Sequence, residues 1–206
     1  MKKYTQGEFN AFPVVDGCKQ CSTGDYTEIK VFGEWCSFGE RCSFGEQCSF
    51  GERCSFGEQC SFGEWCSFGE RCSFGERCSF GEQCSFGEQC SFGEQCSFGE
   101  QCSFGEQCSF GEWCSFGDRC SFGERCSFEN NKKFKPGIPF IRVNNIGSRG
   151  DGCQIFNFTD GLYVRCGCWA GSVEDFVTRV KERHAGTVHE RTYLLAVAMA
   201  KSQFGG

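Results

Sequence analysis

Large apolar residues recur every six positions through the middle of this chain. From Phe32 to Phe128 the unit Phe-Gly-Glu-x-Cys-Ser repeats without insertion or deletion, and only the x position varies appreciably, among Arg, Gln and Trp. With so short a period, no unit can bury its own apolar residues, and each must stack on its copies to make a core. The pattern therefore predicts a solenoid.

Within each unit, Cys-Ser-Phe alternates apolar and polar residues. This alternation is typical of a short strand that turns Cys and Phe to the core and Ser to solvent. The glycine after each Phe permits a positive φ or a close approach of two backbones, so Gly-Glu-x is the predicted bend. Because all bends are alike, we expect the chain to coil in one direction, with parallel strands and identical residues stacked about 4.8 Å apart.

The unit resembles the hexapeptide repeat of left-handed parallel β-helices. In that repeat an aliphatic residue precedes a small or acidic residue, two variable positions, a small residue and one more variable position, and Phe38-Gly39-Glu40-Arg41-Cys42-Ser43 fits this frame. Three hexads form one triangular coil in that family. The resemblance implies a mainly β fold, a single-stranded parallel β-helix that is left-handed and has about five coils over residues 32–128. Phe replaces the aliphatic residue here, so a coil of two or four hexads stays open.

The two flanks differ from the repeat. Residues 1–31 are expected to form an N-terminal cap, and residues 129–206 a small α+β domain that caps or docks at the other end, because open coils present unpaired strand edges. Asp160-Gly161 is the expected hairpin turn of that domain. Ser172 and Thr187, each followed three residues later by a carboxylate, are expected N-caps of two helices. The expected strands are 140–143, 154–158 and 162–165.

Charge is distributed unevenly along the chain. Residues 32–128 hold 15 Glu and Asp118 against six Arg, a net charge of −10, while residues 129–206 carry +4 and residues 1–31 are neutral. Binding to phosphates requires clustered Lys and Arg, so we expect no direct nucleic-acid binding and favour a basic protein as partner. The Glu column is interpreted as a solubilising face of a rod, or alternatively as an acidic ladder that imitates a nucleic-acid backbone or binds cations.

The chain has 21 cysteines. No apolar run follows Met1-Lys2-Lys3, and no stretch could span a bilayer, so we expect no signal peptide, no membrane partner and a reducing compartment with free thiols. In the repeat, Cys is interpreted as the small apolar residue beside Phe, with metal binding or cross-linking as the alternative. Outside it, the Cys18-x-x-Cys21 motif could be a zinc half-site or a redox pair, which Cys153, Cys166 and Cys168 could complete.

Other chemistry-bearing residues carry weaker signals. Trp35, Trp65 and Trp113 occupy x positions and would fall on three different faces of a three-hexad coil, as isolated contact points. His184 and His189 flank the junction of the two expected helices and have no nameable catalytic partner. Sequence alone assigns no catalytic, cofactor-binding or metal-binding residue.

The whole chain also resembles uncharacterised proteins encoded by bacteriophages and prophages. The resemblance rests on residues 14–19, the Cys-Ser-Phe-Gly-Glu array and residues 161–168, and it implies the cytoplasm of a bacterial host or a virion as the setting, with no known activity. Many left-handed β-helix proteins are acyltransferases, but these usually have a catalytic His in or near the coils and an interrupting loop, and residues 32–128 have neither.

The expected function is therefore non-catalytic. A structural or protein-binding solenoid comes first, as a monomer or as an end-to-end dimer. By analogy with right-handed pentapeptide solenoids, the alternative is an acidic inhibitor that occupies the nucleic-acid groove of a host enzyme. A disordered Phe-Gly polymer is a third class, which the exact six-residue spacing disfavours.

Overall fold

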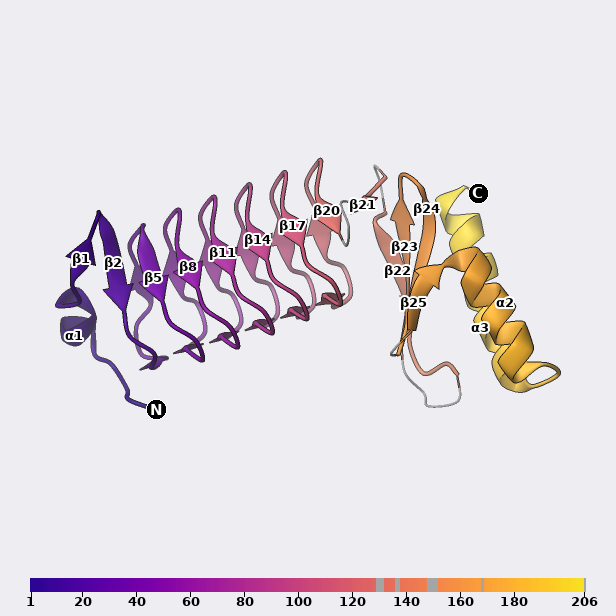
Figure 1. Ribbon diagram of the computed structural model, residues 1–206, viewed down its shortest axis with the longest axis horizontal. Coiled ribbons are helices and arrows are strands. Elements are labelled where there is room, and N and C mark those ends of the chain that lie inside the picture. Colours follow the sequence, from indigo (N-terminus) through magenta and orange to yellow (C-terminus); the bar gives the residue numbers. More distant parts are fainter. Residues whose placement is uncertain (129–131, 136–137, 148–151, 168, 206) are drawn as a thin grey trace. The chain divides into compact units, whose positions relative to one another are not determined.

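The structure is a computed structural model that describes residues 1–128, 132–135, 138–147, 152–167 and 169–205 (Figure 1). The chain divides into two compact units, Met1–Asn131 and Lys132–Gly206. The first unit is a parallel β-solenoid, and the second combines a small antiparallel sheet with two helices. A mainly β parallel solenoid followed by an α+β region was expected from the sequence and is confirmed.

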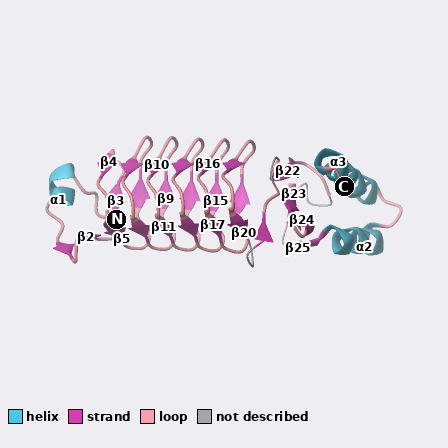
Figure 2. Ribbon diagram, turned by 90° about the horizontal axis from the view of Figure 1, so that it is seen from above, coloured by secondary structure: helices cyan, strands magenta, loops and turns pink. Residues whose placement is uncertain are grey.

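Three sheets form the sides of the solenoid, and Figure 2 shows their strands in regular rows from above. The first contains β1 (Val14–Val15), β2 (Cys18–Cys21), β5 (Cys36–Phe38), β8 (Ser55–Phe56), β11 (Ser73–Phe74), β14 (Ser91–Phe92), β17 (Ser109–Phe110) and β20 (Ser127–Phe128). The second contains β3 (Asp25–Tyr26), β6 (Ser43–Phe44), β9 (Ser61–Phe62), β12 (Ser79–Phe80), β15 (Ser97–Phe98) and β18 (Ser115–Phe116). The third contains β4 (Val31–Phe32), β7 (Ser49–Phe50), β10 (Ser67–Phe68), β13 (Ser85–Phe86), β16 (Ser103–Phe104) and β19 (Ser121–Phe122).

Each coil consists of three hexads. Ser67 pairs with Ser85 and Phe68 with Phe86 in parallel register, so equivalent residues lie 18 positions apart. The second and third sheets have six strands each, which gives about six coils where the sequence predicted about five. The additional coil begins upstream of the repeat, because β2 pairs with β5 and β3 pairs with β6. The left hand of the coil stays a prediction.

Phenylalanine rings fill the core in three columns. Along a column, Phe68 stacks on Phe86 with ring centroids 4.9 Å apart, and between columns Phe68 meets Phe74 edge to face at 5.0 Å. Both geometries are favourable for aromatic pairs. The Cys side chains lie beside the rings and are buried, while the Ser side chains point outward, as the alternation predicted. Three hexads therefore leave enough room for Phe at every inward position.

Each bend requires a close approach of two backbones and one residue with a positive φ, and two different residues meet these requirements. Glycine provides the close approach: a Cβ on Gly87 would lie 2.8 Å from the backbone N of Glu70 and 2.8 Å from the carbonyl C of Gly69, one coil below. The left-handed conformation falls instead on the x residue, as at Gln89 with φ 59°. The N–H of Gln89 donates to the carbonyl of Glu106 at 2.8 Å, and this repeated bond holds the strained residue in place.

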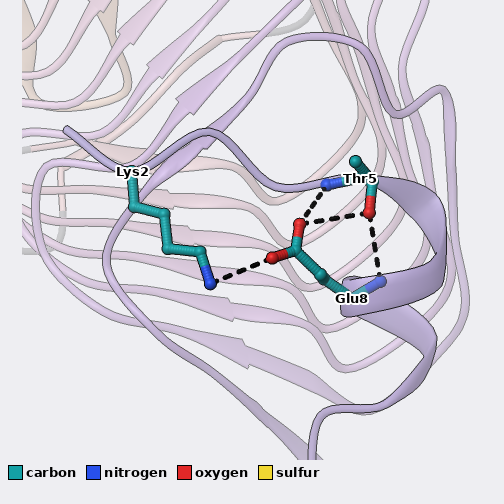
Figure 3. A network of polar contacts seen from close by, with 3 residues as sticks. All are labelled: Lys2, Thr5 and Glu8. Atoms are coloured by element: carbon teal, nitrogen blue, oxygen red, sulfur yellow. Dashed lines mark hydrogen bonds and ion pairs between the residues drawn. The ribbon is translucent and has the colours of Figure 1, made fainter.

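Aromatic residues and a short helix cover the N-terminal end of the solenoid. Tyr4 stacks on Tyr26 at 5.0 Å, and Phe9 of α1 (Gln6–Asn10) packs edge to face on Phe32 at 5.1 Å. Thr5 caps α1 in a capping box with Glu8, whose other carboxylate oxygen pairs with Lys2 at 3.0 Å (Figure 3). The columns of rings therefore continue into this segment, which also supplies a strand-like bridge from Lys3 to Asp25.

The C-terminal unit has two helices on one face of an antiparallel sheet (Figure 1). The sheet has the order β22 (Phe140–Val143), β23 (Cys153–Phe158), β24 (Gly161–Cys166) and β25 (Trp169–Ser172), and β21 (Lys132–Lys133) precedes it. The helices α2 (Val173–His184) and α3 (Val188–Phe204) have Ser172 and Thr187 as N-caps, as predicted. Their core with the sheet includes Ile155, Val164, Phe176 and Val197.

Two details of this unit differ from the prediction. The sequence pattern did not predict β25, a fourth strand that leads directly into α2. The hairpin turn lies one residue earlier than expected, because Phe158 pairs with Gly161 and leaves Thr159 and Asp160 at the turn. This register sets Ile155 opposite Val164, so both residues bury their side chains in the core under the helices.

Candidate functional site

Carboxylates line the three edges of the solenoid. All 15 Glu and the single Asp of the repeat are exposed, and the 18-residue register places one of them on each edge in every coil. Stacked rings define a rise of about 4.9 Å per coil, so three carboxylates per coil give one for about every 1.6 Å of axis. Duplex DNA carries one negative charge for about every 1.7 Å. The carboxylates therefore follow the axis at the charge spacing of duplex DNA.

Arginine is absent from one long stretch of the repeat. Arg41, Arg53, Arg71 and Arg77 occupy x positions in the first eight hexads, and Arg119 and Arg125 lie in the last two. Between Arg77 and Arg119 the chain has no Lys or Arg and has seven carboxylates. We call them the acidic belt: Glu82, Glu88, Glu94, Glu100, Glu106, Glu112 and Asp118. The run of Gln at the x position indicates the belt in the sequence. The net charge of residues 32–128 taken as a whole does not show it.

The three tryptophans of the repeat are dispersed, as predicted. Trp35, Trp65 and Trp113 are 41%, 53% and 39% exposed, and the 18-residue register places them on different edges. The Trp35 ring lies 4.6 Å from the guanidinium carbon of Arg53, one coil above on the same edge. A cation–π contact of this kind is modest at an exposed site. The tryptophans therefore form no common ligand platform.

The repeat cysteines form three buried columns. The Cys90 Sγ lies 3.4 Å from the carbonyl oxygen of Gly69 and the Cys96 Sγ 3.3 Å from that of Gly75, and the same bond recurs along the columns. A hydrogen bond to the Cys114 thiol, together with burial, raises the pKa of Cys96 to about 12. All repeat thiols are buried, so a reagent cannot reach them and these positions suit packing rather than nucleophilic chemistry.

The remaining cysteines belong to different units. Cys18 and Cys21 lie in β2, where Cys21 is buried against Cys36 of the first repeat, whereas Cys153 and Cys166 lie opposite each other in β23 and β24. Cys168 lies outside the described residues. Within the described part of the chain, no three His, Cys, Asp or Glu side chains are grouped as a metal site requires. The structure therefore does not assemble the four-ligand zinc site considered from the sequence within either described unit.

The two histidines lie together at the junction of α2 and α3. Their ring centroids are 5.9 Å apart, and the His184 ring is 5.7 Å from that of Tyr193. The Thr187 hydroxyl donates to the His184 carbonyl at 2.6 Å, and the Glu190 carboxylate accepts from the Gly186 N–H at 2.7 Å. These bonds shape the turn between the helices.

One protein family matches segments of the repeat. Residues 31–45, 35–51, 47–69, 89–111, 101–117 and 113–128 match the sequence model of RNA-binding, Nab2-type zinc fingers. Together these segments span 31–69 and 89–128, less than half of the chain. Zinc fingers with three Cys and one His need a histidine ligand, and both histidines of this chain lie outside the segments. Because the matched thiols are also buried in the columns, their residues do not fit a zinc finger, and the match reflects cysteine spacing.

No curated protein and no solved structure matches the chain. Among the described residues, none of the helices combines the length and the apolar character needed to cross a bilayer. The acidic edges are therefore the candidate site that the geometry supports best, and the belt is their most strongly charged part.

Proposed function

We propose that the protein is a non-catalytic, protein-binding solenoid whose acidic belt docks on a basic protein surface. The observation that carries this proposal is the axial charge spacing of about 1.6 Å, which the belt presents over a stretch of sequence with no Lys or Arg. A surface that evolved to bind phosphates would meet a similar line of charge. In keeping with the resemblance to phage and prophage proteins, we propose a partner in a bacterial host.

The regular backbone supports this role. Hydrogen bonds of 2.9 Å join neighbouring coils. The Gly87 N–H donates to the Phe68 carbonyl, and the Ser85 N–H donates to the Cys66 carbonyl. A scaffold fixed in this way positions its carboxylates before binding, so little conformational entropy of the backbone is lost on association. The Glu side chains themselves are exposed and long, and they can adapt to a partner.

The first experiment distinguishes binding by the belt from binding caused by the net charge of the protein. One variant replaces Glu with Gln at six belt positions, 82, 88, 94, 100, 106 and 112, and a matched control makes the same change at 40, 46, 52, 58, 64 and 70. Both change the net charge by the same amount. Host lysate is passed over each immobilised protein, and retained proteins are eluted by a salt gradient. The belt variant should lose the basic proteins that the parent and the control retain, and equal loss from both variants would contradict docking at the belt.

A narrower second candidate is an inhibitor that occupies a nucleic-acid groove, and the same charge spacing favours it. Its additional requirement is competition: short duplex DNA should release the captured protein, and the solenoid should inhibit that protein's binding to DNA with strong dependence on ionic strength. Retention that DNA does not compete would leave a protein-binding rod without the mimicry. Recovery of virion proteins, or of the protein itself alone, would favour a purely structural rod.

A further inference from the structure

Two thiols of the C-terminal unit face each other across neighbouring strands. Cys153 in β23 is paired directly with Cys166 in β24. Cys153 is fully buried under the helices, whereas Cys166 is partly exposed at the end of its strand. The two side chains are in hydrogen-bonding contact, and neither takes part in the thiol columns of the solenoid.

Backbone hydrogen bonds show which kind of strand pair this is. Asn157, four residues further along β23, donates its N–H to Pro139 at 2.8 Å and accepts from the N–H of Lys135 at 2.9 Å, both on the side away from β24. Backbone groups alternate along a strand, so Cys153 also turns its N–H and C=O away from β24. The Cys153–Cys166 pair is therefore a non-hydrogen-bonded pair.

This geometry brings the two cysteines within bridging range. Opposed Cα atoms in a non-hydrogen-bonded pair lie about 4.5 Å apart, and disulfides bridge Cα separations of about 4.4–6.8 Å. The repeat cysteines differ, because they stack in parallel register and each donates its thiol proton to a glycine carbonyl, as Cys90 does to Gly69. Parallel Cβ vectors do not face each other, so the columns are poorly placed for bridging.

We propose that Cys153 and Cys166 form a reversible disulfide and make the C-terminal unit responsive to peroxide. The thiolate of the more exposed Cys166 attacks hydrogen peroxide, an S–O bond forms, the O–O bond breaks, and the departing oxygen leaves as water after protonation. The Cys153 sulfur then attacks the Cys166 sulfenic acid, the S–S bond forms, the S–O bond breaks, and the Cys153 proton leaves with the second water. Two thiols are oxidised by two electrons, and one peroxide is reduced to two waters.

The disulfide would join the two central strands of the sheet on the face that packs against the helices. It would tie β23 to β24 near their open end, opposite the turn at Thr159 and Asp160. Local opening of the hairpin would then be suppressed in the oxidised protein and restored on reduction. This inference is independent of the acidic belt, so either can fail without the other.

The test uses the full chain and maps its linkages. Trypsin cleaves after Arg149, Arg165 and Arg179, which places Cys153 in the peptide 150–165 and Cys166 in the peptide 166–179. After treatment with hydrogen peroxide and alkylation of the remaining thiols, a digest without reductant should contain these two peptides joined, and dithiothreitol should separate them. Fragmentation of the joined peptides should place the bond at Cys166 rather than Cys168.

Single substitutions supply the controls. C168S should retain the linkage, whereas C166S and C153S should abolish it, and circular dichroism should show that each variant is folded. Should C153S fail to fold, the linkage map of the unsubstituted protein and the C168S variant still decide the matter. A bond from Cys153 to Cys168, a bond among repeat cysteines in place of this one, or the absence of any linked peptide would overturn the proposal.

Discussion

The glycine at each bend should be among the least replaceable residues of the solenoid, and Gly87→Ala tests this. A Cβ at Gly87 would lie 2.8 Å from the Glu70 N, 2.8 Å from the Gly69 carbonyl C and 3.0 Å from the Gly69 O. All three are backbone atoms of the coil below, so no side-chain rotation can make space. Non-bonded heavy atoms avoid steric repulsion only at separations of about 3.5 Å or more.

The required movement sets the magnitude. The two coils would have to separate locally by about 0.6 Å, which lengthens the 2.9 Å bond from the Gly87 N–H to the Phe68 carbonyl beyond the range of a hydrogen bond. Overpacking of this kind costs about 1–3 kcal/mol, and loss of the bond about 1 kcal/mol more. We therefore expect Gly87→Ala to lower the free energy of unfolding by about 2–4 kcal/mol.

A glycine without a coil below it provides the matched control. No atom lies within 4 Å of a Cβ built on Gly33, which precedes Glu34 in the first hexad as Gly87 precedes Glu88 in a central one. Gly33→Ala should leave the free energy of unfolding unchanged or raise it by less than about 1 kcal/mol, because alanine restricts the unfolded chain. Urea unfolding followed by circular dichroism measures both. If the two variants unfold at the same urea concentration, close coil contact is not the reason for glycine at the bend.

Three further predictions concern the x position, the thiols and the N-terminal cap. At Gln95, with φ 59°, Gln95→Val should lower the free energy of unfolding by about 1–3 kcal/mol and Gln95→Gly by less than about 1 kcal/mol, and equal urea midpoints would speak against the left-handed turn. N-ethylmaleimide applied to the native protein should spare the buried repeat cysteines and modify them in denaturant, as counted by intact mass; full native labelling would refute their burial. Hydrogen bonds from the Thr5 backbone N–H and the Lys2 ammonium lower the pKa of Glu8. The ionised Glu8 carboxylate therefore stabilises the fold above the ordinary carboxyl pKa, and this stabilisation is lost as pH falls through the lowered pKa. Glu8→Gln should therefore lower Tm at pH 7 more than at pH 3, and a Tm difference independent of pH would count against this ion pair.

The sequence was most informative where one interaction recurs. The same alternation of apolar and polar residues recurs in sixteen hexads. The inward direction of Cys and Phe and the parallel stacking could therefore be predicted. The start of the solenoid could not, because Cys21 pairs with Phe38 only 17 residues later and the six-residue period fails there. Tyr26 and Phe32 are six apart and occupy the positions of Phe in the first coil, which is the one signal available upstream.

The conformation of the x residue was also beyond the sequence. Left-handed positions usually favour Gly or Asn, whereas the x column contains Arg, Gln and Trp with φ between 56° and 63°. The inter-coil bond from the x N–H, which recurs from Trp35 to Gln107 and measures 2.8 Å between Gln95 and Glu112, compensates for the strain and is visible only once the coil size is known. The preference for Gly or Asn at left-handed positions therefore did not predict this turn, because the stabilising hydrogen-bond acceptor lies 17 residues away.

The identity of the x residue is the principal freedom that this architecture leaves. All sixteen x residues share one backbone conformation, and most of their side chains point to solvent, so packing has no strong preference between Arg and Gln there. Arg nevertheless occurs only in the first eight and the last two hexads, and Gln occupies most of the x positions between Arg77 and Arg119. An even distribution of Arg would reduce repulsion between the carboxylates along each edge. Repulsion within the belt is thus unfavourable for the isolated solenoid, and a basic partner would reduce that repulsion on binding.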